Sequence, residues 1–139
     1  MTVKIRRITS EDAALFDRIA ADVFDEAIDP RRLAAYLARP GNLMVLALKH
    51  GEIVGQCAGV VHTHPDKPDE LYIDEVGTGS AHRRQGIATA MLTELLAWGS
   101  ELGCEDAWLG TERDNHAANA LYRAFKGEED TTKYYEFKL

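Results

Sequence analysis

The spacing of hydrophobic residues divides the chain into short elements, and the first of them is a strand. Residues 2–8, TVKIRRI, alternate apolar and polar side chains, as a half-buried strand does. The following TSED, with Thr9 or Ser10 as the cap, predicts the start of a helix. That helix would present one apolar face, made of Leu15, Phe16, Ile19, Ala20, Val23 and Phe24.

A second, shorter helix is predicted for AIDPRRLAAYLARPG. Asp29 can cap it, Pro30 suits its first turn, and Pro40 with Gly41 would end it. The next run, NLMVLALKHGEIVGQCAGVVHTH, has two apolar stretches around the turn KHGE and predicts an antiparallel hairpin. Its second arm is almost wholly apolar, which indicates a strand buried on both faces.

The second half of the chain alternates strands with helices. LYIDEVGTG predicts a strand with Asp74 and Glu75 in its middle, where a purely structural strand disfavours acids. RQGIATAMLTELLAWGSELG has the clearest helical spacing, with Gly103 as its stop. Three further elements are expected, namely a strand in CEDAWLGT, a helix over about 115–125 and a terminal strand in KYYEFKL. The order predicts a mixed α/β (α+β) fold, with an antiparallel front half and a strand–helix–strand unit behind it.

Length and charge narrow the classes of partner. A chain of 139 residues with 45% apolar content fits one domain, residues 1–139. Its net charge of -7, from 23 acidic and 16 basic residues, argues against nucleic acid as a partner. It suits a cationic partner, and solubility alone explains it equally well. Because no apolar segment resembles a signal peptide or a membrane span, we predict a cytoplasmic protein without a membrane partner.

The cysteines and histidines give no sign of metal or redox chemistry. Cys57 and Cys104 lie singly in apolar contexts without a CxxC spacing, which predicts buried, reduced thiols. His62 and His64 would share one side of a strand, with Asp66 nearby. Two histidines and one loop acid are too few for a metal site, and we predict none.

The turn before the clearest helix combines basic side chains with a glycine. In SAHRRQGIATAML, the first backbone N–H groups of the helix have no intrahelical partner and favour an anion together with the helix dipole. Gly86 lets the backbone approach a phosphate closely, and the small side chain of Ala88 leaves room for it. Arg83 and Arg84 add positive charge. We therefore expect an anion site here, although two arginines before a helix also occur as a solvated pair.

These residues resemble the signature of the GNAT family of N-acetyltransferases, Arg/Gln-x-x-Gly-x-Gly/Ala, which here reads Arg83-Arg84-Gln85-Gly86-Ile87-Ala88. The preceding LYIDEVGTG is similar to the family's fourth strand, and NHAANALYRAF is similar to its Asn-x-x-Ala-x-x-x-Tyr helix. The likeness covers almost the whole chain. It implies the GNAT fold, with acetyl-CoA as the acetyl donor. The implied donor-binding residues are Val76, Gly77, Thr78, Arg83, Arg84, Gln85, Gly86, Ile87, Ala88, Thr89, Asn115, Ala118 and Tyr122.

Two positions depart from the family pattern. Lys126-Gly127 stand where the family usually has Gly-Phe, which affects the turn into the last strand. Gly77 and Thr78 replace the apolar residues common in the fourth strand, and we expect them to widen its bulge.

Three residues are candidates for catalysis. The resemblance places Tyr122 near the thiol of the donor, where a phenol can protonate the departing sulfur; packing in the core is the rival interpretation. Asp74 and Glu75 would point to opposite faces of a regular strand, so we expect one to face the cleft and accept a proton from the substrate ammonium. The other would form a salt bridge or support the donor turn. Backbone N–H groups near Val76 to Thr78 would stabilise the developing oxyanion.

The acceptor is expected to be a small polycationic amine, because acids gather in the loops that rim the acceptor side of this fold. ELYIDEVGTGSAHRRQGIATAML also resembles the corresponding run in the aminoglycoside 3-N-acetyltransferases, so an aminoglycoside is the leading substrate. The alternatives are a polyamine, an amino acid or a protein amine, or a non-catalytic acyl-CoA-binding module. The expected substrate-binding residues are Asp25, Glu26, Asp29, Asp74, Glu75, Glu112 and Asp114.

The expected mechanism is direct transfer in a ternary complex. Neither cysteine is expected in the site, and a free amine needs no enzyme nucleophile. A homodimer through the terminal strands is compatible with the sequence.

Overall fold

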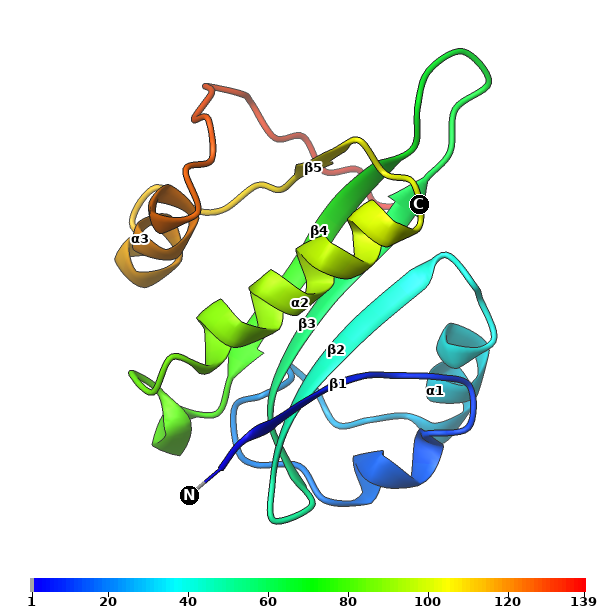
Figure 1. Cartoon of the computed structure of the whole chain (residues 1–139), viewed down its shortest axis with the longest axis vertical. Helices are drawn as coiled ribbons and strands as arrows, with labels where there is room; N and C mark the ends of the chain where they lie inside the picture. The colour runs from blue at the N-terminus through cyan, green and yellow to red at the C-terminus, as the bar shows by residue number, and fades with distance from the viewer. Residues whose placement is uncertain (1) are drawn as a thin grey trace.

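The computed structural model describes residues 2–139, and its centre is a mixed sheet in the order β1-β2-β3-β4-β5 (Figure 1). Neighbouring strands from β1 to β4 are antiparallel, and β5 is parallel to β4. The predicted mixed α/β fold with an antiparallel front half is therefore confirmed. The strands are β1 (Lys4–Arg7), β2 (Asn42–Lys49), β3 (Glu52–His62), β4 (Glu70–Thr78) and β5 (Asp106–Trp108).

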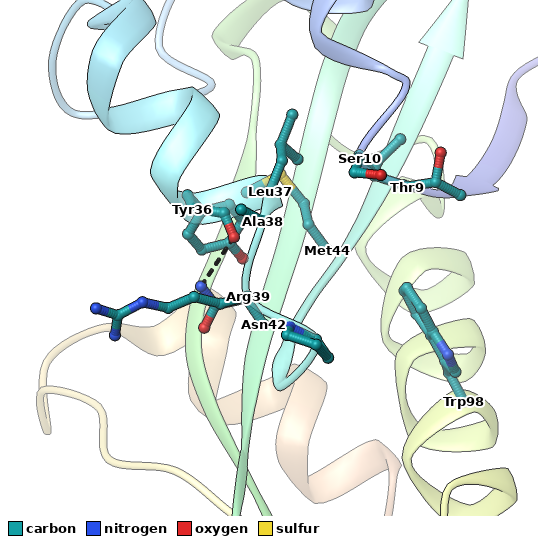
Figure 2. A pocket seen from close by; sticks show the side chains of 11 residues that line it. Thr9, Ser10, Tyr36, Leu37, Ala38, Arg39, Asn42, Met44 and Trp98 are labelled. Carbon is teal, nitrogen blue, oxygen red and sulfur yellow. Dashed lines mark hydrogen bonds between the residues drawn. The ribbon is translucent and has the colours of Figure 1, made fainter.

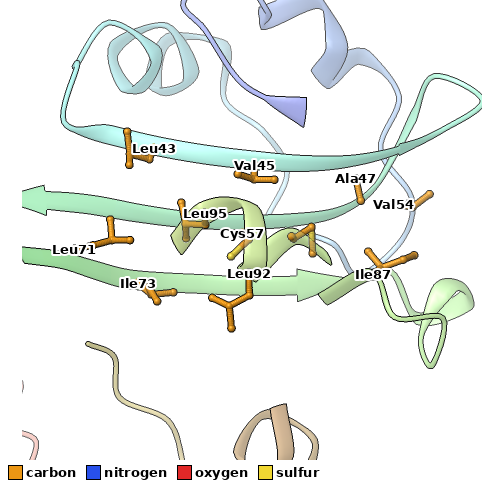
Figure 3. Close-up of a cluster of buried hydrophobic side chains, with 11 residues drawn as sticks. Leu43, Val45, Ala47, Val54, Cys57, Leu71, Ile73, Ile87, Leu92 and Leu95 are labelled. Carbon is orange, nitrogen blue, oxygen red and sulfur yellow. The ribbon is translucent and has the colours of Figure 1, made fainter. Parts of the chain in front are cut away.

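Helix α2 (Ile87–Glu101) lies across one face of this sheet and builds the larger core with it (Figures 1 and 3). Its apolar residues recur at the predicted spacing, and Gly103 follows its end with a φ of +99°. That conformation suits glycine because it has no Cβ. The core on this face consists of Leu43, Val45, Ala47, Val54, Cys57, Leu71, Ile73, Ile87, Met91, Leu92 and Leu95.

The opposite face of the sheet is covered by η1 (Ala13–Asp17), α1 (Pro30–Leu37) and the chain between them. Buried side chains there include Phe16, Val23 and Leu46. The predicted cap of α1 is confirmed, because the Asp29 side chain accepts hydrogen bonds from the backbone N–H groups of Arg31 (2.8 Å) and Arg32 (3.2 Å).

The helix predicted after Ser10 is wrong beyond one short turn. Only the 3-10 turn η1 forms, and the chain then runs extended beside β3. The Ile53 N–H donates to the Arg18 carbonyl (2.9 Å), and the Ala20 N–H donates to the Ile53 carbonyl (2.8 Å). These bonds to β3 replace the helical ones, while Phe16 and Val23 remain buried as the apolar pattern required.

The predicted terminal strand is also wrong. After α3 (His116–Ala124) no residue up to 139 forms a helix or strand, and Tyr134 and Phe137 are 86% and 81% exposed. The physical reason lies in β5, which is only three residues long and offers little edge for another strand to pair with. Within residues 2–139 no helix is both long and apolar enough to cross a membrane.

Candidate active site

Strands β4 and β5, the last pair in the sheet, separate partway along β4, and this leaves one edge of β4 open. Their pairing is limited to Glu70–Tyr72 and Asp106–Trp108, whereas β4 continues to Thr78. On its other side β4 remains paired with β3 up to Gly55↔Thr78. The backbone N–H and C=O groups that follow Tyr72 on the β5 side are therefore available to an extended ligand.

A bulge in β4 places Asp74 and Glu75 on the same face. Ala58 pairs with Glu75 and Gly59 with Ile73, so Asp74 is the extra residue. Ile73 and Val76 both pack against the α2 core, whereas Ala58, which pairs with Glu75, belongs to the core of the opposite face. The two acids of the bulge therefore face that opposite side. The prediction that they point to opposite faces is wrong, because it assumed a regular strand.

The environment of Glu75 favours its protonated form more than water does. Burial raises the pKa of Glu75, the charges of Asp25 and Asp74 raise it further, and the Gln56 amide lowers it. The pKa of Asp74 is also raised, by the partial loss of water around an otherwise exposed side chain; a hydrogen bond from its own backbone N–H opposes this effect. Two adjacent carboxyls with raised pKa values form a site that can accept and hold a proton.

Two residues that the sequence did not single out stand near this pair. Gln56 is 0% exposed, and its Oε1 atom has no hydrogen-bond partner. Tyr36 of α1 also has a buried hydroxyl without a partner; burial and the charges of Asp74 and Glu75 raise its pKa. The lone amide in the apolar run EIVGQCAGVVH was the available signal for Gln56.

The acidic residues predicted to bind the substrate lie in different environments. The charge of Asp25 acts on Glu75 and raises the pKa of that carboxyl. Asp29 caps α1, and its assignment to the substrate stays a prediction. Glu26, Glu112 and Asp114 are exposed and lie in loops.

The turn before α2 has the shape of an anion cradle. Gly86 is the N-cap residue of α2 with a φ of +75°, and no side chain caps the helix. The backbone of Arg84 also has a left-handed conformation, with a φ of 62°. The Nε atom of Arg83 donates a hydrogen bond to the Thr78 carbonyl (3.4 Å). A Cβ on Gly86 would meet no atom within 4 Å, so the space in front of the cradle is open.

The side chains around this cradle fall into two groups. Those of Arg83, Arg84, Gln85 and Thr89 are exposed, and that of Ala88 is half-buried. Ile87 is 4% exposed and belongs to the core, so only its backbone can serve an anion. Its assignment to the donor site stays a prediction.

Helix α3 places Tyr122 against the α2 core. Burial and the nearby Cys57 thiol raise the pKa of Tyr122, so its hydroxyl keeps its proton at neutral pH. Cys57 is itself buried, and burial together with Asp74 raises its pKa to about 12. Cys57 thus lies nearer the site than predicted, yet as a neutral thiol it is a poor nucleophile. Asn115 caps α3 by accepting from the Ala118 N–H (3.1 Å).

A depression of about 260 Å³ lies elsewhere on the molecule, between the end of α1, the chain after β1 and Trp98 of α2 (Figure 2). Neither Asp74 nor Glu75 lines it, although Tyr36 does. The two histidines considered for a metal lie beside other side chains. The Nε2 atom of His64 is 2.8 Å from the Oε1 atom of Glu70, and the centroids of the His62 and Trp108 rings are 6.0 Å apart.

Comparison with known proteins defines the class to which this arrangement belongs. The sequence model of the acetyltransferase (GNAT) family matches residues 7–126. The chain therefore belongs to the acetyltransferase (GNAT) family. Members of this family use acetyl-CoA, and one structural neighbour is the aminoglycoside N-acetyltransferase AAC(6')-Iy in complex with CoA, with 15% identity and a TM-score of 0.77.

Two further sets of relatives differ in the acceptors that their own names state. An L-2,4-diaminobutyric acid acetyltransferase of Oceanobacillus iheyensis is 35% identical over 71 residues, which are 51% of this chain and 37% of that protein. Its counterpart in Virgibacillus pantothenticus is 38% identical over 52 residues, 37% of this chain and 31% of that protein. The chain thus covers well under half the length of these relatives. An aminoglycoside acetyltransferase from a soil metagenomic sample, in complex with sisomicin, has a TM-score of 0.83 at 20% identity, covering 99% of this chain and 96% of that chain.

Proposed function

We propose that the chain transfers an acetyl group from acetyl-CoA to a primary amine of a small polycationic molecule, with the 3-amino group of an aminoglycoside as the leading acceptor. The observation that carries this proposal is the pair Asp74 and Glu75, set side by side by the β4 bulge next to the open edge of that strand. Adjacent carboxyls attract an ammonium group and can take its proton.

The residues present fit acetyl-CoA. The uncapped start of α2 and the open space in front of Gly86 suit a pyrophosphate, and the arginines beside it reinforce the site. The free edge of β4, including Val76, Gly77 and Thr78, suits the amide groups of a pantetheine arm. When bound, acetyl-CoA supplies an activated thioester.

In this proposal each functional group of the chain has one task. Glu75, assisted by Asp74, takes a proton from the acceptor ammonium and frees the lone pair of its nitrogen. Backbone N–H groups of the open β4 edge stabilise negative charge on the carbonyl oxygen under attack. The Tyr122 hydroxyl, still protonated at neutral pH, is a donor for the departing sulfur. The raised pKa of Cys57 supports direct transfer in a ternary complex over a covalent acyl-enzyme.

Two observations bear on the choice of acceptor. The whole-chain structural likeness favours an aminoglycoside, while the curated relatives act on a diamino acid. Both acceptors carry primary amines close to further polar groups. A cation with several charges suits a site in which Asp25 joins Asp74 and Glu75, and this supports the polycationic assignment.

Mass spectrometry of reaction products tests the proposal. The chain is mixed with acetyl-CoA and, separately, with an aminoglycoside, spermidine or L-2,4-diaminobutyrate. We expect the aminoglycoside to gain one acetyl group, with NMR of the product locating it on the 3-amino nitrogen. Acetylation of only spermidine or diaminobutyrate would overturn the aminoglycoside assignment. Binding of acetyl-CoA with no acetylated product would instead indicate a non-catalytic binding module.

A further inference from the structure

Gln56 is a buried polar residue whose side-chain amide is only partly hydrogen-bonded. It stands in the middle of β3, 0% exposed, among the apolar residues of the η1–α1 face. Its Oε1 has no hydrogen-bond partner, and its Nε2 lies 3.5 Å from the Val23 carbonyl oxygen, at the outer limit of a hydrogen bond. An unpaired buried polar atom costs about 1–3 kcal/mol of stability.

The strand register brings Gln56 within reach of Glu75. Gln56 pairs with Gly77, and Glu75 pairs with Ala58, so Gln56 and Glu75 are diagonal neighbours across β3 and β4. The Gln56 amide favours the ionised form of the Glu75 carboxylate. Gly77 lies next to Gln56, since a Cβ on Gly77 would be 3.2 Å from the Gln56 Nε2 and 2.5 Å from the Val23 carbonyl oxygen. Gln56 therefore stands between the strand that carries Glu75 and the segment that carries Asp25.

We propose that Gln56 is a positioning residue, whose amide holds the Glu75 carboxylate in place and ties it to the Val23–Asp25 segment of the acceptor site. This inference rests on the proposed function, in which Glu75 is the base. Asp74, Asp25 and the Tyr36 hydroxyl are the other titratable groups facing Glu75. Both acids disfavour the ionised carboxylate, so the Gln56 amide is the group that counteracts them.

The matched test uses two substitutions on the same face of the sheet. Gln56→Met keeps the length of the side chain and removes the amide. Leu46→Met changes the shape of the residue paired with Gln56 across the strands, also 0% exposed, without any polar change. Since Gln56→Met removes an unpaired buried oxygen, we expect its denaturation midpoint to equal or exceed that of the unsubstituted chain.

The decisive readout is the pH dependence of kcat/KM. We expect the acid limb of the Gln56→Met profile to move to higher pH, with a several-fold loss of kcat/KM below the midpoint, while the Leu46→Met profile keeps its position. Identical profiles for all three proteins would overturn the inference. If Gln56→Met does not fold, Gln56→Leu provides the same comparison.

A second readout separates this inference from the proposed function. NMR titration of the Glu75 carboxyl in the free protein should give a higher pKa in Gln56→Met than in the unsubstituted chain. An unchanged Glu75 titration contradicts the positioning role even in an active enzyme. Absence of turnover with every amine, together with a shifted titration, contradicts the proposed function and leaves the Gln56–Glu75 relationship established.

Discussion

Gly77 of β4 approaches the Val23 carbonyl oxygen so closely that a Cβ on residue 77 would lie 2.5 Å from that oxygen. The absence of a side chain therefore allows the segment that carries Asp25 to pack against β4. We expect Gly77→Ala to displace this segment and lower kcat/KM for the acceptor at least about tenfold, with a smaller change in acetyl-CoA affinity. Steady-state kinetics with each substrate varied in turn would measure both effects.

Gly41→Ala is the control for this substitution. A Cβ at Gly41 meets only the Val61 carbonyl oxygen, at the ordinary contact distance of 3.8 Å. Its kinetics should match those of the unsubstituted chain. A Gly77→Ala protein whose main defect is weaker acetyl-CoA binding would contradict the expectation that the added side chain acts chiefly on the Asp25 segment.

At the start of α2 the backbone should matter more than the arginines. Gly86 has a φ of +75° and open space in front of it, so a bulky side chain there strains the turn and occupies the place of an anion. We expect Gly86→Val to weaken acetyl-CoA binding at least about tenfold, or about 1.4 kcal/mol. Arg83→Ala removes one exposed charge and should cost only a few-fold. Calorimetric titration compares the two, and a larger loss for Arg83→Ala would refute the backbone cradle.

Because the pKa values of Asp74 and Glu75 are raised, replacing Glu75 with a neutral residue should change stability and activity in opposite directions. Because the folded chain binds these protons more tightly than the unfolded chain, their contribution to stability is full at acid pH and is lost as pH rises through the raised pKa values. Glu75→Gln should therefore raise the denaturation midpoint at neutral pH, and this gain should vanish at acid pH. It should also lower turnover by about 100-fold or more.

Asp74→Asn is the companion variant. Because Asp74 is the more exposed acid, its substitution should change both stability and turnover less than Glu75→Gln does. A greater loss of turnover in Asp74→Asn would exchange the roles of base and neighbour between the two residues.

The turn after α3 should tolerate the glycine that the family usually has there. Lys126 has a φ of 61°; its N–H donates to the Arg123 carbonyl (2.9 Å), and the Gly127 N–H donates to the Tyr122 carbonyl (3.1 Å). These are the two bonds of a Schellman turn, with a lysine at the position that favours glycine. Lys126→Gly should stabilise the chain by about 0.5–1 kcal/mol in denaturant titrations. Lys126→Ala, which keeps the strain, should give no such gain.

The sequence predicted the elements whose stability is local or strongly periodic. The hairpin of β2 and β3, the helix α2 with Gly103 after it, and α1 with its Asp29 cap all follow from spacing, turn and cap residues. The prediction failed where contacts between residues distant in sequence determine the local structure. The residues after η1 have a helical pattern, yet Arg18 and Ala20 hydrogen-bond to Ile53 of β3.

The candidate site shows the same division. The turn around Gly86 was visible because its residues are consecutive in the chain. The shared face of Asp74 and Glu75 depends on a bulge, which the pairing with Ala58 and Gly59 creates and which no pattern within β4 reveals. Tyr36 could not be placed because its nearness to these acids arises from the packing of α1 over the sheet.

Release of free thiol from acetyl-CoA is the most direct test of the central claim, that this chain acetylates an amine with Glu75 as the base. The unsubstituted chain and Glu75→Gln are compared at neutral pH, with and without an aminoglycoside, at equal occupancy by acetyl-CoA. The account predicts acceptor-dependent release by the unsubstituted chain and a loss of about 100-fold or more in Glu75→Gln, with acetyl-CoA affinity preserved. Equal release by the two proteins, or release that does not depend on an amine, would contradict it.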